Sequence, residues 1–102
     1  MKEQYDPSQI SKIIDQSLAY QCACPAQVCR AIFELRDLYR YQMECINDSH
    51  NDALVHQAIA DAAVKSHVVM EECLTQVLEI EGWDIATLAM PPQLKAKQRR
   101  AL

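Results

Sequence analysis

The chain has 102 residues, which is enough for one domain with one hydrophobic core. Half of the residues are hydrophobic and 24% are charged, a balance typical of a folded globular protein rather than a disordered one. The single glycine, Gly82, excludes glycine-rich phosphate-binding loops and disfavours an all-β fold, because both need several glycines. The formal net charge is −4, and residues 1–92 hold six basic and fourteen acidic residues, which disfavours general nucleic-acid binding.

The sequence predicts a cytoplasmic protein without a membrane anchor. No apolar run approaches the ~18 residues that a membrane span requires, and the first six residues lack the apolar core of a secretory signal. The five cysteines are therefore expected to be mostly reduced thiols, and their odd number agrees with this expectation. Because the last ten residues hold four bases and no acid, we expect one helical domain over residues 1–92 and a basic, mobile tail over residues 93–102.

The first predicted helix spans about residues 7–21. Asp6 is its expected N-cap, with Pro7 at the first helical position and Gln9 completing a capping box. Pro25 separates this helix from the next, because a proline disfavours the helical conformation of the residue before it. The helical spacing predicts one buried stripe, formed by Ile10, Ile13, Ile14, Ser17 and Leu18.

Two further helices are predicted over about residues 25–46 and 50–81. A turn of capping residues joins them, with Ser49 and Asp52 as a second capping box, and Gly82 ends the third helix with Trp83 packed against that end. A short last helix, about 85–90, is expected between Asp84 and the Pro91-Pro92 pair. The fold class is therefore all-α. The predicted core row of the second helix is Val28, Ile32, Leu35, Tyr39, Met43 and Ile46.

The third helix carries apolar residues on two faces. One face holds Val55, Ile59, Ala62, Val69, Cys73, Val77 and Ile80. The other face lies about 120–160° away at 100° per residue and holds His56, Ala60, Ala63, His67, Leu74 and Leu78. Two shorter helices of one chain cover only one face of so long a helix. We therefore expect the second face to be the seam of a homo-oligomer, a dimer or a larger bundle; in the alternative, the first and last helices cover it within one chain.

Four cysteines are candidates for a thiol site. Cys22, Cys24 and Cys29 flank the junction of the first two helices, with Cys24 at the expected N-cap, where a thiolate is stabilised. If the second and third helices form an antiparallel hairpin, opposing residue numbers add to about 97 and Cys73 faces Cys24. Such a cluster could bind zinc or an iron–sulfur cluster, form a reversible disulfide, or simply fill the core. We expect packing, with a metal-binding or redox-responsive site as the alternative.

The remaining polar residues do not predict an enzyme. His67 and Glu71 lie one helical turn apart, and such a pair either binds a metal between helices or forms an ordinary hydrogen bond. No serine–histidine–carboxylate pattern stands out, and Cys29 and His67 would have to bridge two faces to form a dyad. The sequence thus predicts a non-enzymatic interaction or accessory protein, whose acidic third helix could also dock a basic protein partner.

Overall fold

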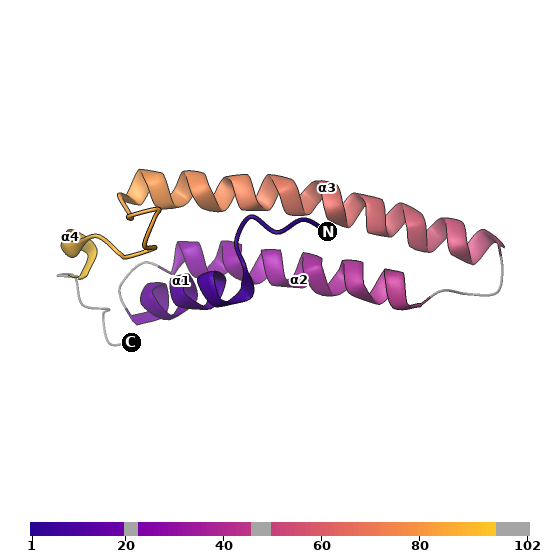
Figure 1. The fold of residues 1–102 in the computed structure, drawn as a ribbon, viewed down its shortest axis with the longest axis horizontal. Helices are drawn as coiled ribbons and strands as arrows, with labels where there is room; N and C mark the ends of the chain where they lie inside the picture. Colours follow the sequence, from indigo (N-terminus) through magenta and orange to yellow (C-terminus); the bar gives the residue numbers. More distant parts are fainter. Residues whose placement is uncertain (20–22, 46–49, 96–102) are drawn as a thin grey trace.

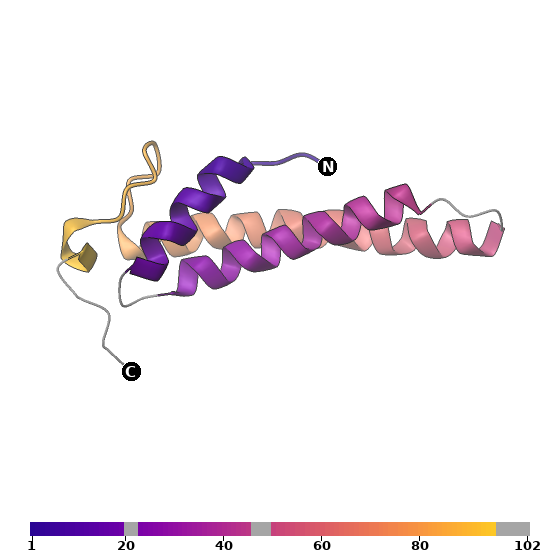
Figure 2. The same ribbon diagram turned by 90° about the horizontal axis from the view of Figure 1, so that it is seen from below.

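A computed structural model shows a helical architecture and describes residues 1–19, 23–45 and 50–95 (Figure 1). The helices are α1 (Pro7–Ala19), α2 (Cys24–Glu44), α3 (His50–Glu81) and α4 (Pro92–Lys95). α2 and α3 lie side by side and antiparallel along the length of the molecule, and α1 packs against α2 at an angle (Figures 1 and 2). The expected all-α fold with three main helices is confirmed. Within the described ranges, no helix is both long enough and apolar enough to cross a membrane.

The start of α1 is fixed by the predicted capping box. The Gln9 N–H donates to Asp6 Oδ1 (2.8 Å), and the Asp6 N–H donates to Gln9 Oε1 (2.9 Å). The Ser8 hydroxyl donates to the same carboxylate (2.7 Å), and these hydrogen bonds lower the pKa of Asp6. α1 ends at Ala19, and the predicted stripe is buried at Ile10, Ile13 and Ser17.

α2 begins one residue earlier than predicted and buries its predicted core row only in part. Ala23 is its N-cap and makes no side-chain capping bond, so Cys24 is the first helical residue rather than the cap. Of the predicted core row, Ile32 is buried, Val28, Leu35 and Tyr39 are half-buried, Met43 is 45% exposed and Ile46 lies outside the described residues. The buried side of α2 faces α3 as well as α1 and the N-terminal residues, since Arg36 and Gln42 contact α3. Its buried residues are Pro25, Ala26, Cys29, Ile32, Arg36 and Gln42.

α3 spans the predicted range, and Gly82 ends it as predicted. Gly82 has a φ of 85°, a left-handed conformation that glycine adopts without steric cost. Its N–H donates to the Glu79 carbonyl (3.1 Å), and the Trp83 N–H donates to the Leu78 carbonyl (2.9 Å), which is the Schellman pattern. Trp83 is buried against the core, so its predicted role is confirmed. Ser49, the expected cap at the other end, lies outside the described residues.

The prediction of a short helix over residues 85–90 is wrong. Residues 85–88 form a turn that the pairing of Asp84 with Ala89 closes. Asp84 does cap this segment, since its Oδ1 accepts from the Thr87 N–H (3.0 Å), but Leu88 adopts a left-handed φ of 57° and stops the helix. The last short helix begins later, at Pro92, and Leu94 in the expected tail packs against the core.

The hydrophobic core lies at the end of the hairpin where α1 and the C-terminal segment gather (Figure 1). Lys12 Nζ donates to the Thr87 carbonyl (2.7 Å), and Gln16 bonds the backbone of Leu88 (2.7 Å) and of Met90 (3.0 Å), so α1 and the turn hold each other in place. Of the described helices, α2 and α3 form the other half of the hairpin. The core residues are Tyr5, Ile10, Ile13, Cys29, Ile32, Leu74, Leu78, Trp83, Leu88 and Met90.

We predict that the substitution Gly82→Ala lowers the free energy of unfolding by about 1–2 kcal/mol, because an L-residue with a side chain is strained at this φ. Urea unfolding followed by circular dichroism measures the change. Glu79→Ala, at an exposed position in the last turn of α3, is the matched control. Equal stability of the two variants would contradict the assigned role of Gly82.

Candidate functional site

The three described candidate thiols, Cys24, Cys29 and Cys73, do not form a metal-binding group. Cys24 is exposed, Cys29 is buried, Cys73 is half-buried, and Cys22 lies outside the described residues. Across residues 1–19, 23–45 and 50–95, no group of three or more histidine, cysteine, aspartate or glutamate side chains is placed to hold a metal ion. Burial raises the pKa of the Cys29 thiol to about 12, which disfavours the thiolate that metal binding or nucleophilic attack requires.

The register of the hairpin explains why Cys73 does not face Cys24. Gln42 contacts His56 near the loop (2.6 Å), and Arg36 contacts His67 further along (2.9 Å). The residue numbers in these pairs add up to about 98 and about 103, rather than to a constant value, as the two helices turn around each other. Sums above 97 set Cys73 opposite residues that follow Cys24 on α2 rather than opposite Cys24 itself.

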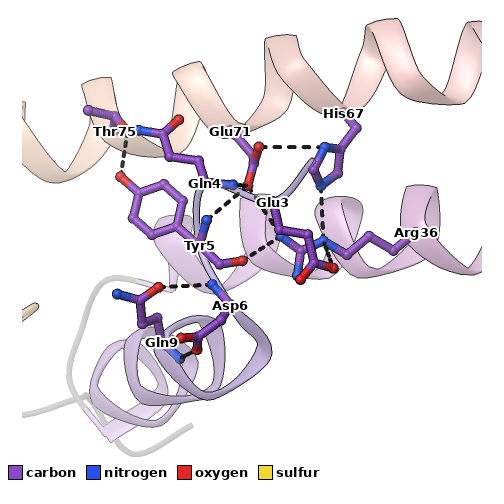
Figure 3. A network of polar contacts seen from close by, with 9 residues as sticks. All are labelled: Glu3, Gln4, Tyr5, Asp6, Gln9, Arg36, His67, Glu71 and Thr75. Atoms are coloured by element: carbon purple, nitrogen blue, oxygen red, sulfur yellow. Dashed lines mark hydrogen bonds and ion pairs between the residues drawn. The ribbon is translucent and has the colours of Figure 1, made fainter. Parts of the chain in front are cut away.

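A buried polar network connects α2, α3 and the first residues of the chain (Figure 3). It centres on Arg36 of α2 and on His67 and Glu71 of α3, which are 6%, 1% and 4% exposed. Arg36 Nη2 lies 3.2 Å from Glu71 Oε2, and Arg36 Nε donates to His67 Nε2 (2.9 Å). His67 Nδ1 lies 3.5 Å from Glu71 Oε1 and completes the triangle. The predicted His67–Glu71 contact is thus present, but it is buried and includes a guanidinium group.

The N-terminal segment (residues 1–6) supplies the other half of this network. The backbone N–H groups of Gln4 and Tyr5 both donate to Glu71 Oε2, at 2.7 and 3.0 Å. The Tyr5 carbonyl accepts from Arg36 Nη2 (2.6 Å), and the Tyr5 hydroxyl is hydrogen-bonded to Thr75. Glu3 adds a second carboxylate 3.3 Å from Arg36 Nε. The buried charges are therefore matched by each other and by the backbone of this segment.

His67 is held in its neutral form. Its Nε2 accepts from Arg36, so the proton of the neutral ring is assigned to Nδ1, which faces Glu71. Burial lowers the pKa of His67, and the Arg36 charge acts in the same direction, whereas Glu71 and Glu3 oppose them. A protonated ring would lose the Arg36 hydrogen bond and bring two positive charges together.

The network is arranged for structure rather than for chemistry. Its three central side chains are nearly inaccessible to solvent, and most of their polar atoms are paired within the network, although Arg36 Nη1 is buried without a hydrogen-bond partner. Catalysis requires a side-chain atom that a substrate can reach from solvent, and neither Glu71 nor His67 offers such an atom. The arrangement can hold the N-terminal segment against the hairpin and can exclude a proton from His67.

The face of α3 expected at the oligomer seam is buried within the chain, and the other apolar face is largely exposed. Five of the six residues expected at the oligomer seam are buried inside the single chain, where α2 and the core cover them: Ala60, Ala63, His67, Leu74 and Leu78. The sixth, His56, is half-buried and contacts Gln42 of α2. These six residues therefore form an inner face, and the seam prediction is corrected, because contacts within one chain already bury it.

The other stripe, here called the outer face, remains open to solvent. It comprises Val55, Ile59, Ala62, Val69, Cys73, Val77 and Ile80. Val55, Val69 and Ile80 are 56%, 61% and 78% exposed, and Ile59, Cys73 and Val77 are half-buried. A shallow groove of about 290 Å³ runs beside it, lined by Leu35 and Leu38 of α2 and by Ala58, Ile59, Ala62, Ala63 and Ser66 of α3.

Arg36 and the N-terminal segment are the residues that the sequence analysis missed. Arg36 lies four residues after Ile32 and seven after Cys29, so it falls on the same helical stripe as two apolar residues. A lone arginine on such a stripe, with Glu71 on the apolar face of the next helix, is the available signal for a buried ion pair. Nothing in the pattern of residues 1–6 indicates that their backbone completes it.

No protein-family model, no curated protein and no solved structure matches this chain. The function is therefore argued from the surface and the network alone.

We predict that Arg36→Met lowers the free energy of unfolding by about 3–5 kcal/mol, because it leaves the buried Glu71 carboxylate without its cation. Arg40→Met is the matched control on the same helix. Arg40 forms an exposed pair with Asp37 (3.1 Å) and should cost at most about 1 kcal/mol. Urea unfolding measures both changes, and similar losses in the two variants would show that the network adds no net stability.

The lowered pKa of His67 predicts a loss of stability at acid pH. Above about pH 6.5 the ring is neutral in both the folded and the unfolded chain, and its folded-state contacts are intact. As the pH falls below 6.5, the unfolded chain binds the proton first, so the free energy of unfolding decreases. Urea midpoints between pH 7.5 and 5 should show a smaller decrease for His67→Gln than for the unsubstituted protein; an unchanged slope would contradict the assignment.

Proposed function

We propose that this protein is a non-enzymatic, homo-oligomeric interaction protein that self-associates through the outer face of α3. The observation that carries the proposal is the exposure of this face. It presents apolar side chains along most of a helix, while the opposite side of the same helix is buried by its own chain. Single exposed apolar residues are normal, but a contiguous exposed stripe marks an interaction site.

The groove beside the outer face supports association with a helix. Its lining is almost wholly apolar, and it lies between α2 and α3, where a third helix can pack against two at once. Further apolar residues, Leu38 (40% exposed) and Tyr41 (61% exposed), extend the surface along α2. The half of the hairpin near the loop gains most from such a partner, because α1 does not cover it (Figure 1).

The burial of the polar network favours an interaction role over catalysis. The one extensive network of titratable groups among the described residues is shielded from solvent, and its donors and acceptors serve the fold. The four described cysteines are free thiols, which agrees with the reducing conditions of the cytoplasm, and we place the protein there.

Neighbouring valines provide a matched test of the outer face. Val69 lies on the face (61% exposed), whereas Val68 is also exposed (48%) but points about 100° away around the helix. Light scattering coupled to gel filtration should give the unsubstituted chain and Val68→Glu a mass above the 11.6 kDa of one chain. Val69→Glu should shift towards 11.6 kDa with its helix content unchanged by circular dichroism.

A single species of 11.6 kDa for the unsubstituted chain at every concentration would overturn the proposal. If Val68→Glu and Val69→Glu lowered the mass equally, the outer face would not be the site of association.

A further inference from the structure

The outer face has the spacing of a coiled-coil seam. With Ser66 added and Gln76 taken in place of its neighbour Val77, a row along this face alternates in steps of four and three. Its positions are Val55, Ile59, Ala62, Ser66, Val69, Cys73, Gln76 and Ile80. An average step of about 3.5 residues keeps a seam facing a partner helix along its whole length. The row runs through α3 as an unbroken helix, so a partner helix can follow it from end to end.

The row is also complementary to the same row of a second copy that runs in the opposite direction. Its positions are symmetric about the point between His67 and Val68, so an antiparallel second copy forms four kinds of layer. The layers pair Val55 with Ile80, Ile59 with Gln76, Ala62 with Cys73, and Ser66 with Val69. Reversal places the two smallest side chains opposite larger ones, whereas a parallel pair stacks Ala62 on Ala62 and Ser66 on Ser66 and leaves voids.

The charges beside the row favour the same arrangement. Lys65 is the one basic residue of α3, and Glu72 lies two turns further along the same flank of the outer face. Both side chains are exposed. An antiparallel pair brings Lys65 of one copy beside Glu72 of the other, and symmetry produces this contact twice. In a parallel pair, the position opposite Lys65 is Met70, and no charge is matched.

The N-terminal segment leaves this arrangement unobstructed. It contacts Glu71 and Thr75, which lie about 160–200° around the helix from Val55 at 100° per residue. α1 packs on α2. The covered side of α3 is thus opposite the outer face.

We propose that two copies of this chain pair through α3 in antiparallel orientation, with a twofold axis at the level of His67 and Val68. The pairing sets Ala62 of each copy against Cys73 of the other. This inference rests on the proposed self-association and adds its orientation and register. A seam about 38 Å long on a helix about 10 Å across covers roughly 400 Å² on each copy, or about 800 Å² in total, which is below the range of stable interfaces, so we expect a weak dimer that dissociates on dilution.

Disulfide trapping tests the register. The native Cys73 residues of the two copies are about 16 Å apart along the seam, so they do not link to each other. In a chain with Cys22, Cys24 and Cys45 replaced by serine, Ala62→Cys should give a covalent dimer on mild oxidation. Mass spectrometry should identify the link as residue 62 to Cys73. Adding Cys73→Ser should abolish the link, and Asp61→Cys, one residue off the seam, should trap less than about a tenth as much.

A charge exchange tests the orientation without cysteine chemistry. Lys65→Glu alone and Glu72→Lys alone should each weaken dimerisation about fivefold to tenfold, and the double variant should restore it, as measured by sedimentation equilibrium. Absence of restoration, or absence of the link from residue 62 to Cys73 in a chain that still dimerises, overturns the register and leaves the proposed function standing. A chain that is monomeric at all concentrations overturns both.

Discussion

Glu71 is the buried charge around which the rest of the chain is arranged. A carboxylate that is 4% exposed is unstable unless its charge is matched and its lone pairs are filled. The Arg36 guanidinium on α2 matches the charge of the Glu71 carboxylate. Two backbone N–H groups of the N-terminal segment donate to Glu71 Oε2. These partners lie 35 to 67 residues away in the sequence, so a single side chain joins three segments.

This constraint places the helices relative to one another. The Arg36–Glu71 contact fixes how far α2 slides along α3, and the Arg36–His67 hydrogen bond fixes the rotation of both helices. Because Asp6 follows Tyr5 directly and caps α1, the segment that binds Glu71 also determines where α1 begins. The hydrophobic core forms beyond this point, at the end of the hairpin where α1 crosses it. The hairpin thus has a three-helix part, which α1 crosses, and a part that α1 does not reach (Figure 2).

The helix ends could be predicted from the sequence because their causes are local. Asp6, Gln9 and Gly82 act within one helical turn of where they stand, and each was correctly assigned. The turn at residues 85–88 shows the limit of this approach. An aspartate caps a single turn in the same way as it caps a helix, so Asp84 alone does not distinguish the two structures. Leu88 distinguishes them, because it is buried in the core in a left-handed conformation that ends a helix.

The assignment of the two faces of α3 failed for a different reason. Valine and isoleucine dominate the outer face, whereas the inner face contains His67 and Glu71, so hydrophobicity alone favours burying the outer face. The chain buries the more polar face because Arg36 and the N-terminal backbone are available to pair with it, and no periodic pattern shows those distant partners. The residue pairing assumed for the hairpin, which set Cys73 opposite Cys24, ignored the same kind of contact.

The buried polar network also resolves an ambiguity that two apolar faces create. α2 could bury apolar area against either face of α3, and area alone separates the two packings poorly. With α2 on the inner face, Arg36 reaches Glu71 and His67; with α2 on the outer face, Arg36 would be buried against valine and isoleucine without a counter-charge. The cost of an unpaired buried charge thus excludes the second packing. The same selection leaves the outer face of α3, with Val55, Val69 and Ile80, exposed to solvent.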